Sequence, residues 1–164
     1  MSTGAYAFLL FGDAEHLLPG IRTAGALPAV AGWHAVDGHF HLVLTLRDAD
    51  NGLRAELAAI PGVEDLQFCE VAKELVGGFD ADAEHCHAWL TMEIDADKRD
   101  DIERQLQAPG APRFGALAFG SCGCVAALSG DTFEAIDAAV DAFIRPLDGV
   151  LRVKRERIID LTQL

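Results

Sequence analysis

The feature that most constrains this chain is an order of elements that occurs twice. Strand-length apolar runs and helical patterns alternate along its first half in the order β-α-β-β-α-β. The expected elements are a strand at 6–11, a helix at 14–26, strands at 29–36 and 39–46, a helix near 53–60 and a strand at 63–71. Asp37-Gly38, a strong turn signal, joins the two middle strands as a hairpin.

The same order restarts after residue 85. The expected elements are a strand at 86–94, a helix at 97–107, two strands within 113–129, a helix from 133 and a strand at 150–161. A Gly-Val step precedes the last strand of each half, at Gly62-Val63 and at Gly149-Val150. We therefore predict an α+β chain of two tandem ferredoxin-like βαββαβ units, each an antiparallel sheet with helices on one face.

The predicted units occupy residues 1–75 and 85–164, and the glycine- and acid-rich segment 76–84 reads as a linker between them. Each sheet has an open face that needs a cover. The two units could press these faces together as an intramolecular pseudo-dimer, or each unit could pair with a second chain in a homo-oligomer.

Composition limits the classes of partner that the protein is expected to bind. The formal net charge is -13 and the pI is about 4.6, so the surface repels phosphate and anionic lipid, and no direct nucleic-acid partner is expected. The basic residues of 152–157 alternate as in a solvated edge strand. No apolar stretch approaches the roughly 20 residues that span a bilayer, and the N-terminus lacks the pattern of a secretion signal. We expect no membrane contact, a cytoplasmic location and four reduced cysteines.

Three segments of the first half carry a resemblance to a known family. They are Leu27-Pro28-Ala29-Val30, the hairpin at 36–44, and Ile60-Pro61-Gly62-Val63 with a strand that ends in Lys73. With these segments, residues 5–75 resemble the effector-binding RAM domain of Lrp/AsnC-type regulators, a relative of the ACT domain. The resemblance implies a domain that binds a small effector. His41 stands where the family usually has an acid, so the family's ligand contact at that position is not expected here. No helix-turn-helix precedes either unit, so the DNA-reading role is not expected either.

Strand alternation predicts which side chains share a face. In the strand at 39–46 the apolar alternate residues, from Phe40 to Leu46, are expected to face the helices, which leaves His39 and His41 on the open face. Alignment of the two halves places Cys122 and Cys124 at the corresponding positions of the second unit.

The first strand of the second unit follows the same rule. Its apolar set, from Cys86 to Ile94, is expected under the helices, and His85, His87 and Trp89 are expected on the open face. His85 and His87 are possible additional metal ligands. They would lie roughly 15–20 Å from Cys122, too far to share one metal ion with it.

Imidazoles and thiolates two residues apart on one strand face suit joint ligation of a metal. One hypothesis is therefore a site for zinc, copper or nickel formed by His39, His41, Cys122 and Cys124. Two alternatives stay open, namely packing residues at an interface and thiol redox chemistry through Cys122-Gly123-Cys124.

Turns that expose the backbone are the candidates for effector binding. Gly12-Asp13 follows the first strand, where ACT-like domains bring the main chain close to an amino-acid effector, and Asp37-Gly38 forms the second such place. The alternative is that both are simply turns.

No dinucleotide-binding fingerprint, P-loop or nucleophile elbow occurs in the chain. We predict a regulatory or sensory module that binds a small effector, such as an amino acid, and acts through self-association. One alternative is a protein that binds a transition metal or a haem-related cofactor through its His and Cys residues. Another is a small enzyme that uses a His-lined cavity between the sheets.

Overall fold

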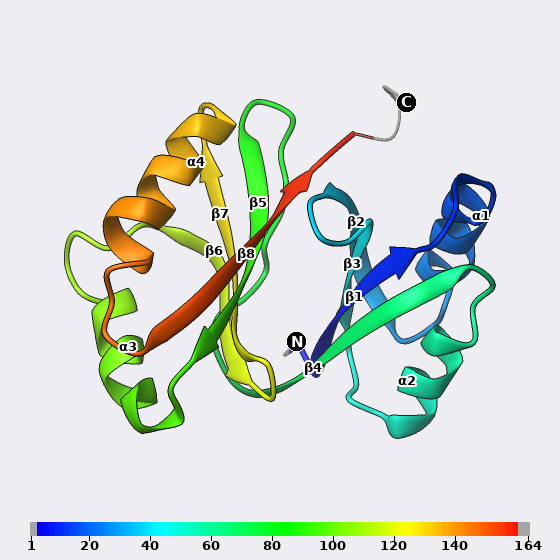
Figure 1. Ribbon diagram of the computed structural model, residues 1–164, viewed down its shortest axis with the longest axis horizontal. Helices are drawn as coiled ribbons and strands as arrows, with labels where there is room; N and C mark the ends of the chain where they lie inside the picture. Colours follow the sequence, from blue (N-terminus) through cyan, green and yellow to red (C-terminus); the bar gives the residue numbers. More distant parts are fainter. Residues whose placement is uncertain (1–2, 161–164) are drawn as a thin grey trace.

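The computed structural model describes residues 3–160 and has the predicted order of elements (Figure 1). The strands are β1 (Ala5–Phe11), β2 (Val30–Asp37), β3 (Leu42–Leu46), β4 (Val63–Val76), β5 (Cys86–Ile94), β6 (Phe114–Gly120), β7 (Gly123–Gly130) and β8 (Val150–Ile158). The helices are α1 (Ala14–Gly25), α2 (Asn51–Ala58), α3 (Arg99–Leu106) and α4 (Phe133–Ala139), with a 3-10 turn η1 (Ala96–Lys98) before α3 and a π-helical turn η2 (Val140–Ile144) after α4. The predicted end of the last strand, Leu161, lies outside the described residues.

Short polar side chains start three of the helices. Asp13 accepts a hydrogen bond from the His16 N–H in α1, Asp50 caps α2, and Thr132 accepts from the Ala135 N–H in α4. Each cap satisfies a backbone donor that has no partner within its helix. No helix in residues 3–160 combines the length and the apolar character that crossing a membrane requires.

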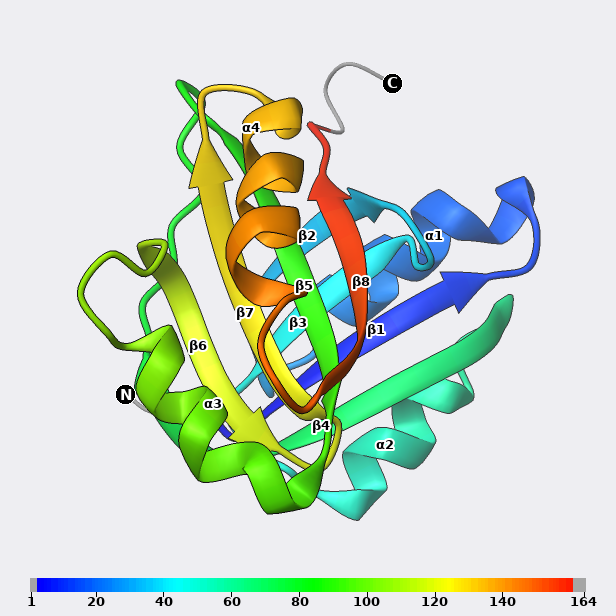
Figure 2. The same ribbon diagram turned by 60° about the vertical axis from the view of Figure 1, so that its left-hand side comes forward.

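The strands form one closed antiparallel ring in the order β1-β3-β2-β8-β5-β7-β6-β4. Helices α1 and α2 cover the outside of the first-half strands, and α3 and α4 cover the outside of the second-half strands (Figure 1, Figure 2). The α+β fold with antiparallel strands and helices on one face is therefore confirmed. The two halves also share edges, which the sequence did not predict, because β4 pairs with β6 and β2 pairs with β8.

The two shared edges differ in length. β4 pairs with β6 from Val71 to Val76, whereas β2 pairs with β8 at Val36 and Asp37. The first part of β2 thus lies beyond the stretch that pairs with β8. The segment 77–85 connects β4 to β5, and its Phe79 ring contacts the His34 ring of β2, with ring centroids 5.5 Å apart.

The buried apolar side chains of residues 3–160 form three layers. One layer lies between the first-half strands and α1 and α2, and a second lies between the second-half strands and α3 and α4. The third layer joins the inner faces of the two halves. It contains Tyr6, Phe8, Val36, Phe40, Val43 and Cys69 from the first half, and Trp89, Ala116, Ala118, Val125 and Ala127 from the second. Each open face is therefore covered by the other.

The strand registers show which positions of the two halves are equivalent. Phe11 pairs with Val63 and Ile94 pairs with Val150, and each valine belongs to the shared Gly-Val step, so Phe11 and Ile94 are equivalent. Five residues earlier, Tyr6 and Trp89 are therefore equivalent, and so are their strand partners Cys69 and Glu156. The rings of Tyr6 and Trp89 meet in the inner layer with centroids 5.2 Å apart. This contact joins the two halves at one shared position.

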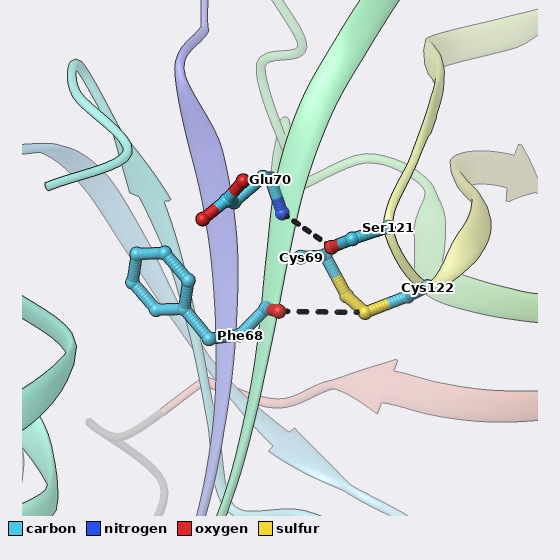
Figure 3. Close-up of a disulfide and its surroundings, with 5 residues drawn as sticks. All are labelled: Phe68, Cys69, Glu70, Ser121 and Cys122. Atoms are coloured by element: carbon cyan, nitrogen blue, oxygen red, sulfur yellow. Dashed lines mark hydrogen bonds between the residues drawn. A yellow bond between two sulfur atoms is a disulfide. The ribbon is translucent and has the colours of Figure 1, made fainter. Parts of the chain in front are cut away.

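The equivalent positions Cys69 and Glu156 each tie their own half to the other. Cys69 forms a disulfide with Cys122, in the turn between β6 and β7 (Figure 3). Beside it, Ser121 donates its N–H to the Glu70 carbonyl at 3.0 Å, and the Ser121 hydroxyl accepts from the Glu70 N–H at 2.9 Å. The expectation of four reduced cysteines is therefore wrong for this pair.

Glu156 makes the second tie, to the turn between β2 and β3. Its side chain is fully buried, and its carboxylate accepts hydrogen bonds from the N–H groups of His39 and Phe40, both at 3.1 Å. Gly38 permits this approach, because a Cβ there would lie 2.4 Å from the Arg155 carbonyl oxygen. Burial raises the pKa of Glu156 to about 7.

The prediction of a solvated edge strand at 152–157 is wrong. This segment belongs to β8, which lies between β5 and β2 and pairs with β5 from Ala88 to Ile94. Alternation did predict two faces, but the inner one carries Glu156, which the sequence did not mark as buried.

The disulfide yields a first prediction. Replacing Cys69 and Cys122 together by Ser should lower the free energy of unfolding by about 3–4 kcal/mol, because the bond closes a loop with a sequence separation of 53 residues. Chemical denaturation measures the loss, and Cys86→Ser, at a free cysteine, serves as the matched control. A thiol assay on the denatured, unreduced protein should count two free thiols. A count of four would show that the disulfide is absent.

A second prediction follows from Glu156. Its pKa is raised in the folded state, so the folded protein holds this proton more tightly than the unfolded chain, and the associated stability is lost as the pH rises from about 4.5 to about 7. The loss should reach at most about 3 kcal/mol. Glu156→Gln should flatten this part of the pH profile in denaturation experiments. An unchanged slope in the variant would show that other groups cause it.

Candidate ligand-binding site

A cavity of about 370 Å³ opens where β2 lies beyond its pairing with β8. Its walls come from both halves and from the connecting segment. The lining residues are Thr3, Tyr6, Ala31, Gly32, Trp33, His34, Thr45, Leu46, Arg47, Gly78, Phe79, Asp80, Trp89 and Ala116. The cavity therefore reaches from the protein surface to the layer between the two halves.

Aromatic side chains form the deep wall of this cavity. Trp89 is almost fully buried and contacts Tyr6, while Phe79 packs edge-on against it with ring centroids 5.3 Å apart. The Phe79 ring also lies edge-on to His34 and to His87, each at 5.5 Å. Phe79 belongs to the segment predicted as a linker, which therefore supplies part of the inner layer.

His34 is the imidazole on the inner wall. Its Nδ1 accepts a hydrogen bond from the indole N–H of Trp89 at 3.1 Å. Burial is the main reason that the pKa of His34 lies below its ordinary value, and the charge of the nearby His87 lowers this pKa further. The imidazole is therefore neutral at pH 7.

Charged groups of opposite sign line the outer part of the cavity. Arg47 donates from Nη1 to the carbonyl oxygens of Pro28 at 2.6 Å and Val30 at 3.0 Å, which holds its guanidinium in place. Asp80 lies on the connecting segment, and Thr3 and Thr45 add hydroxyl groups. Burial raises the pKa of Tyr6, so its phenol stays protonated.

The structure does not form the predicted metal site. Cys122 is bonded to Cys69, and Cys124 lies fully buried under the helices, where burial raises the pKa of its thiol to about 12. His39 is exposed, and His41 accepts the Phe11 N–H at Nδ1. No group of three or more His, Cys, Asp or Glu side chains within residues 3–160 could hold a metal ion. The alternative of thiol redox chemistry between Cys122 and Cys124 is also corrected, because Cys122 is bonded to Cys69.

A shift of register explains this error. Leu9 pairs with Leu42 in the first half, and Met92 pairs with Cys124 in the second, so Cys124 is equivalent to Leu42. Cys122 then corresponds to Phe40, and both belong to the inner layer. Phe40 was expected under the helices, but it lies in the turn before β3, where strict alternation does not apply.

His85 and His87 have protein partners outside the cavity lining. His87 is buried, with Nδ1 2.6 Å from the Ser129 hydroxyl and Nε2 3.0 Å from the carbonyl oxygen of Asp82. His85 is exposed, and its hydrogen bond to the Asp82 carboxylate raises the pKa of its imidazole.

The two turns predicted to bind an effector have structural roles. At the first turn, Asp13 caps α1 and the Gly12 N–H donates to the Gly62 carbonyl. At the second turn, Asp37 lies opposite Arg157 in the ladder between β2 and β8, and Gly38 makes room for Glu156. None of the four lines the cavity described above. Effector binding at these turns stays a prediction.

No protein-family model matches the chain, and no curated protein matches it either. Solved structures do share its fold. The siroheme decarboxylase NirDL superposes with a TM-score of 0.72 at 12% identity, covering 97% of this chain and 71% of that one. NirDL in complex with an iron-uroporphyrin III analogue gives 0.69 at the same identity and coverage.

Two further structures align less closely. A monooxygenase, named as putative, from Fusobacterium nucleatum has a TM-score of 0.52 at 10% identity and covers 96% of this chain and 93% of that one. A regulator of staphylococcal pathogenesis has the same score and identity, with 93% and 97% covered. At these identities the likeness is one of fold, and it supports the α+β, ferredoxin-like fold expected from the sequence.

Proposed function

We propose that this protein is a regulatory or sensory module that binds a small organic effector in the cavity between its two halves. The observation that carries the proposal is the lining of that cavity, which combines an aromatic inner wall with a few polar groups near its mouth. Binding sites for small molecules generally have this composition, and about 370 Å³ lies within their usual range of volumes.

The groups near the mouth favour a ligand with polar ends and an apolar body. Arg47 would attract a carboxylate, and Asp80 would attract an ammonium group. The rings of Phe79 and Trp89 would contact an apolar or aromatic side chain. An amino acid has all three features, so amino acids are the effector class that we propose first.

Effector binding would act through the geometry of the cavity. Its walls come from both halves and from the segment 77–85, so a bound effector would hold these three parts together. A change in their relative position could alter self-association, which we propose as the output. We propose no nucleic-acid partner, because the net charge of -13 opposes contact with phosphate.

A second candidate ligand is a tetrapyrrole. One observation favours it, namely the shared fold with NirDL, a siroheme decarboxylase also solved with an iron-uroporphyrin III analogue. Catalysis on such a molecule would be an activity of the same cavity. The matched fold alone does not select this candidate over an amino acid.

A thermal-shift screen with amino acids, aromatic carboxylates and tetrapyrroles tests the proposal. A ligand at 100 times its dissociation constant adds about 2.7 kcal/mol, which should raise the melting temperature by about 5–10 °C. Gly32→Leu should abolish the shift, because a Cβ at Gly32 has no heavy atom within 4 Å and the added side chain would extend into the cavity.

Ala72→Leu, at an exposed position of β4 outside the cavity, is the matched control and should keep the shift. A ligand that stabilises Gly32→Leu as strongly as the unmodified protein binds elsewhere. No stabilisation by any ligand class would contradict the proposed function.

A further inference from the structure

The hydrogen bond between His34 and Trp89 fixes the position of the His34 proton. An indole N–H is a donor and never an acceptor, so the Nδ1 atom that lies 3.1 Å from it must be unprotonated. The lowered pKa of His34 agrees with a neutral ring. A neutral imidazole without a proton on Nδ1 carries that proton on Nε2.

The Nε2–H group of His34 is available to a ligand. Within residues 3–160, no hydrogen bond or ion pair engages this atom, and it is not among the buried polar atoms that lack a partner. The ring is half-buried and lines the cavity. The remaining nitrogen can thus be reached from the cavity, and in this tautomer it is a donor.

From these contacts we infer that His34 donates a hydrogen bond from Nε2 to the ligand, and that the cavity selects a metal-free organic molecule with a carboxylate or carbonyl acceptor. The inference rests on the proposed function, because it concerns the ligand of that cavity. Trp89 acts as a positioning residue, since it sets the tautomer of His34.

The same geometry disfavours His34 as a metal ligand. A metal needs the lone pair of Nε2, so the proton would move to Nδ1 and face the indole N–H of Trp89. Trp89 is only 1% exposed, so its N–H would find no replacement partner in water. Leaving a buried donor unpaired in this way should weaken metal binding by about 10- to 100-fold.

Nitrogen NMR of the imidazoles tests the tautomer directly. At pH 7.5 the His34 resonances should show a protonated Nε2 and an unprotonated Nδ1. Trp89→Phe removes the indole donor but keeps an aromatic ring, and it should allow both tautomers. A protonated Nδ1 or an imidazolium in the unmodified protein would overturn the inference.

Matched probes test the choice of ligand. We would compare phenylacetate with phenethylamine, 3-phenylpropionate with 3-phenylpropylamine, and indole-3-acetate with tryptamine. Each pair offers one apolar body with either an acceptor or a cationic donor. At least one acid should bind ten or more times tighter than its amine, and His34→Leu should weaken that acid by about 10- to 100-fold. His34→Gln, which keeps an N–H donor, should weaken it less.

Cobalt(II) provides the opposite readout through its visible absorption. Cobalt should bind at His34 of the unmodified protein about 10- to 100-fold more weakly than at His34 of Trp89→Phe. Cobalt bound equally well by both, or amines bound as tightly as acids, would overturn the inference. If none of the six probes binds but another compound stabilises the protein and Gly32→Leu abolishes that effect, the proposed function stands and this inference fails.

Discussion

The structure depends on burial of the two inner sheet faces against each other. Each half carries an apolar inner face that a single unit could not leave in water, and the rings of Tyr6 and Trp89 meet between the paired faces. Because both faces belong to one chain, their association needs no second molecule. The cavity and the ties between the halves are consequences of this pairing.

The two halves have equivalent positions but are held together unequally. At one edge the disulfide of Cys69 and Cys122 accompanies a ladder from Val71 to Val76, and at the other edge Glu156 is hydrogen-bonded beside a ladder of two register pairs. A covalent tie and a longer ladder close the first edge firmly. The second edge leaves part of β2 unpaired with β8, and the cavity lies there. The unequal pairing of the two edges thus leaves room for the cavity beside β2.

Local patterns in the sequence predicted the fold well, and long-range contacts set the limit. Alternation in β5 placed Leu90 and Met92 under the helices and Trp89 on the inner face, as the structure has them, because a regular strand keeps a period of two. The same reasoning failed for Phe40 and Cys124, because a turn of different length precedes the strand in each half. The burial of Glu156 and the insertion of Phe79 depend on contacts with the other half or with a distant strand, which no local pattern encodes.

The packing of the two halves on each other also explains how a histidine on one half becomes a defined donor. Trp89 is held in place by its contact with the equivalent Tyr6 and by the Phe79 ring, so the direction of its indole N–H is set by the pairing of the halves. His34 comes from the first half and meets that N–H across the inner layer. One half alone could not fix this tautomer, because the donor and the acceptor belong to different halves. The chemistry of the cavity therefore arises from the interface between the halves and from neither half alone.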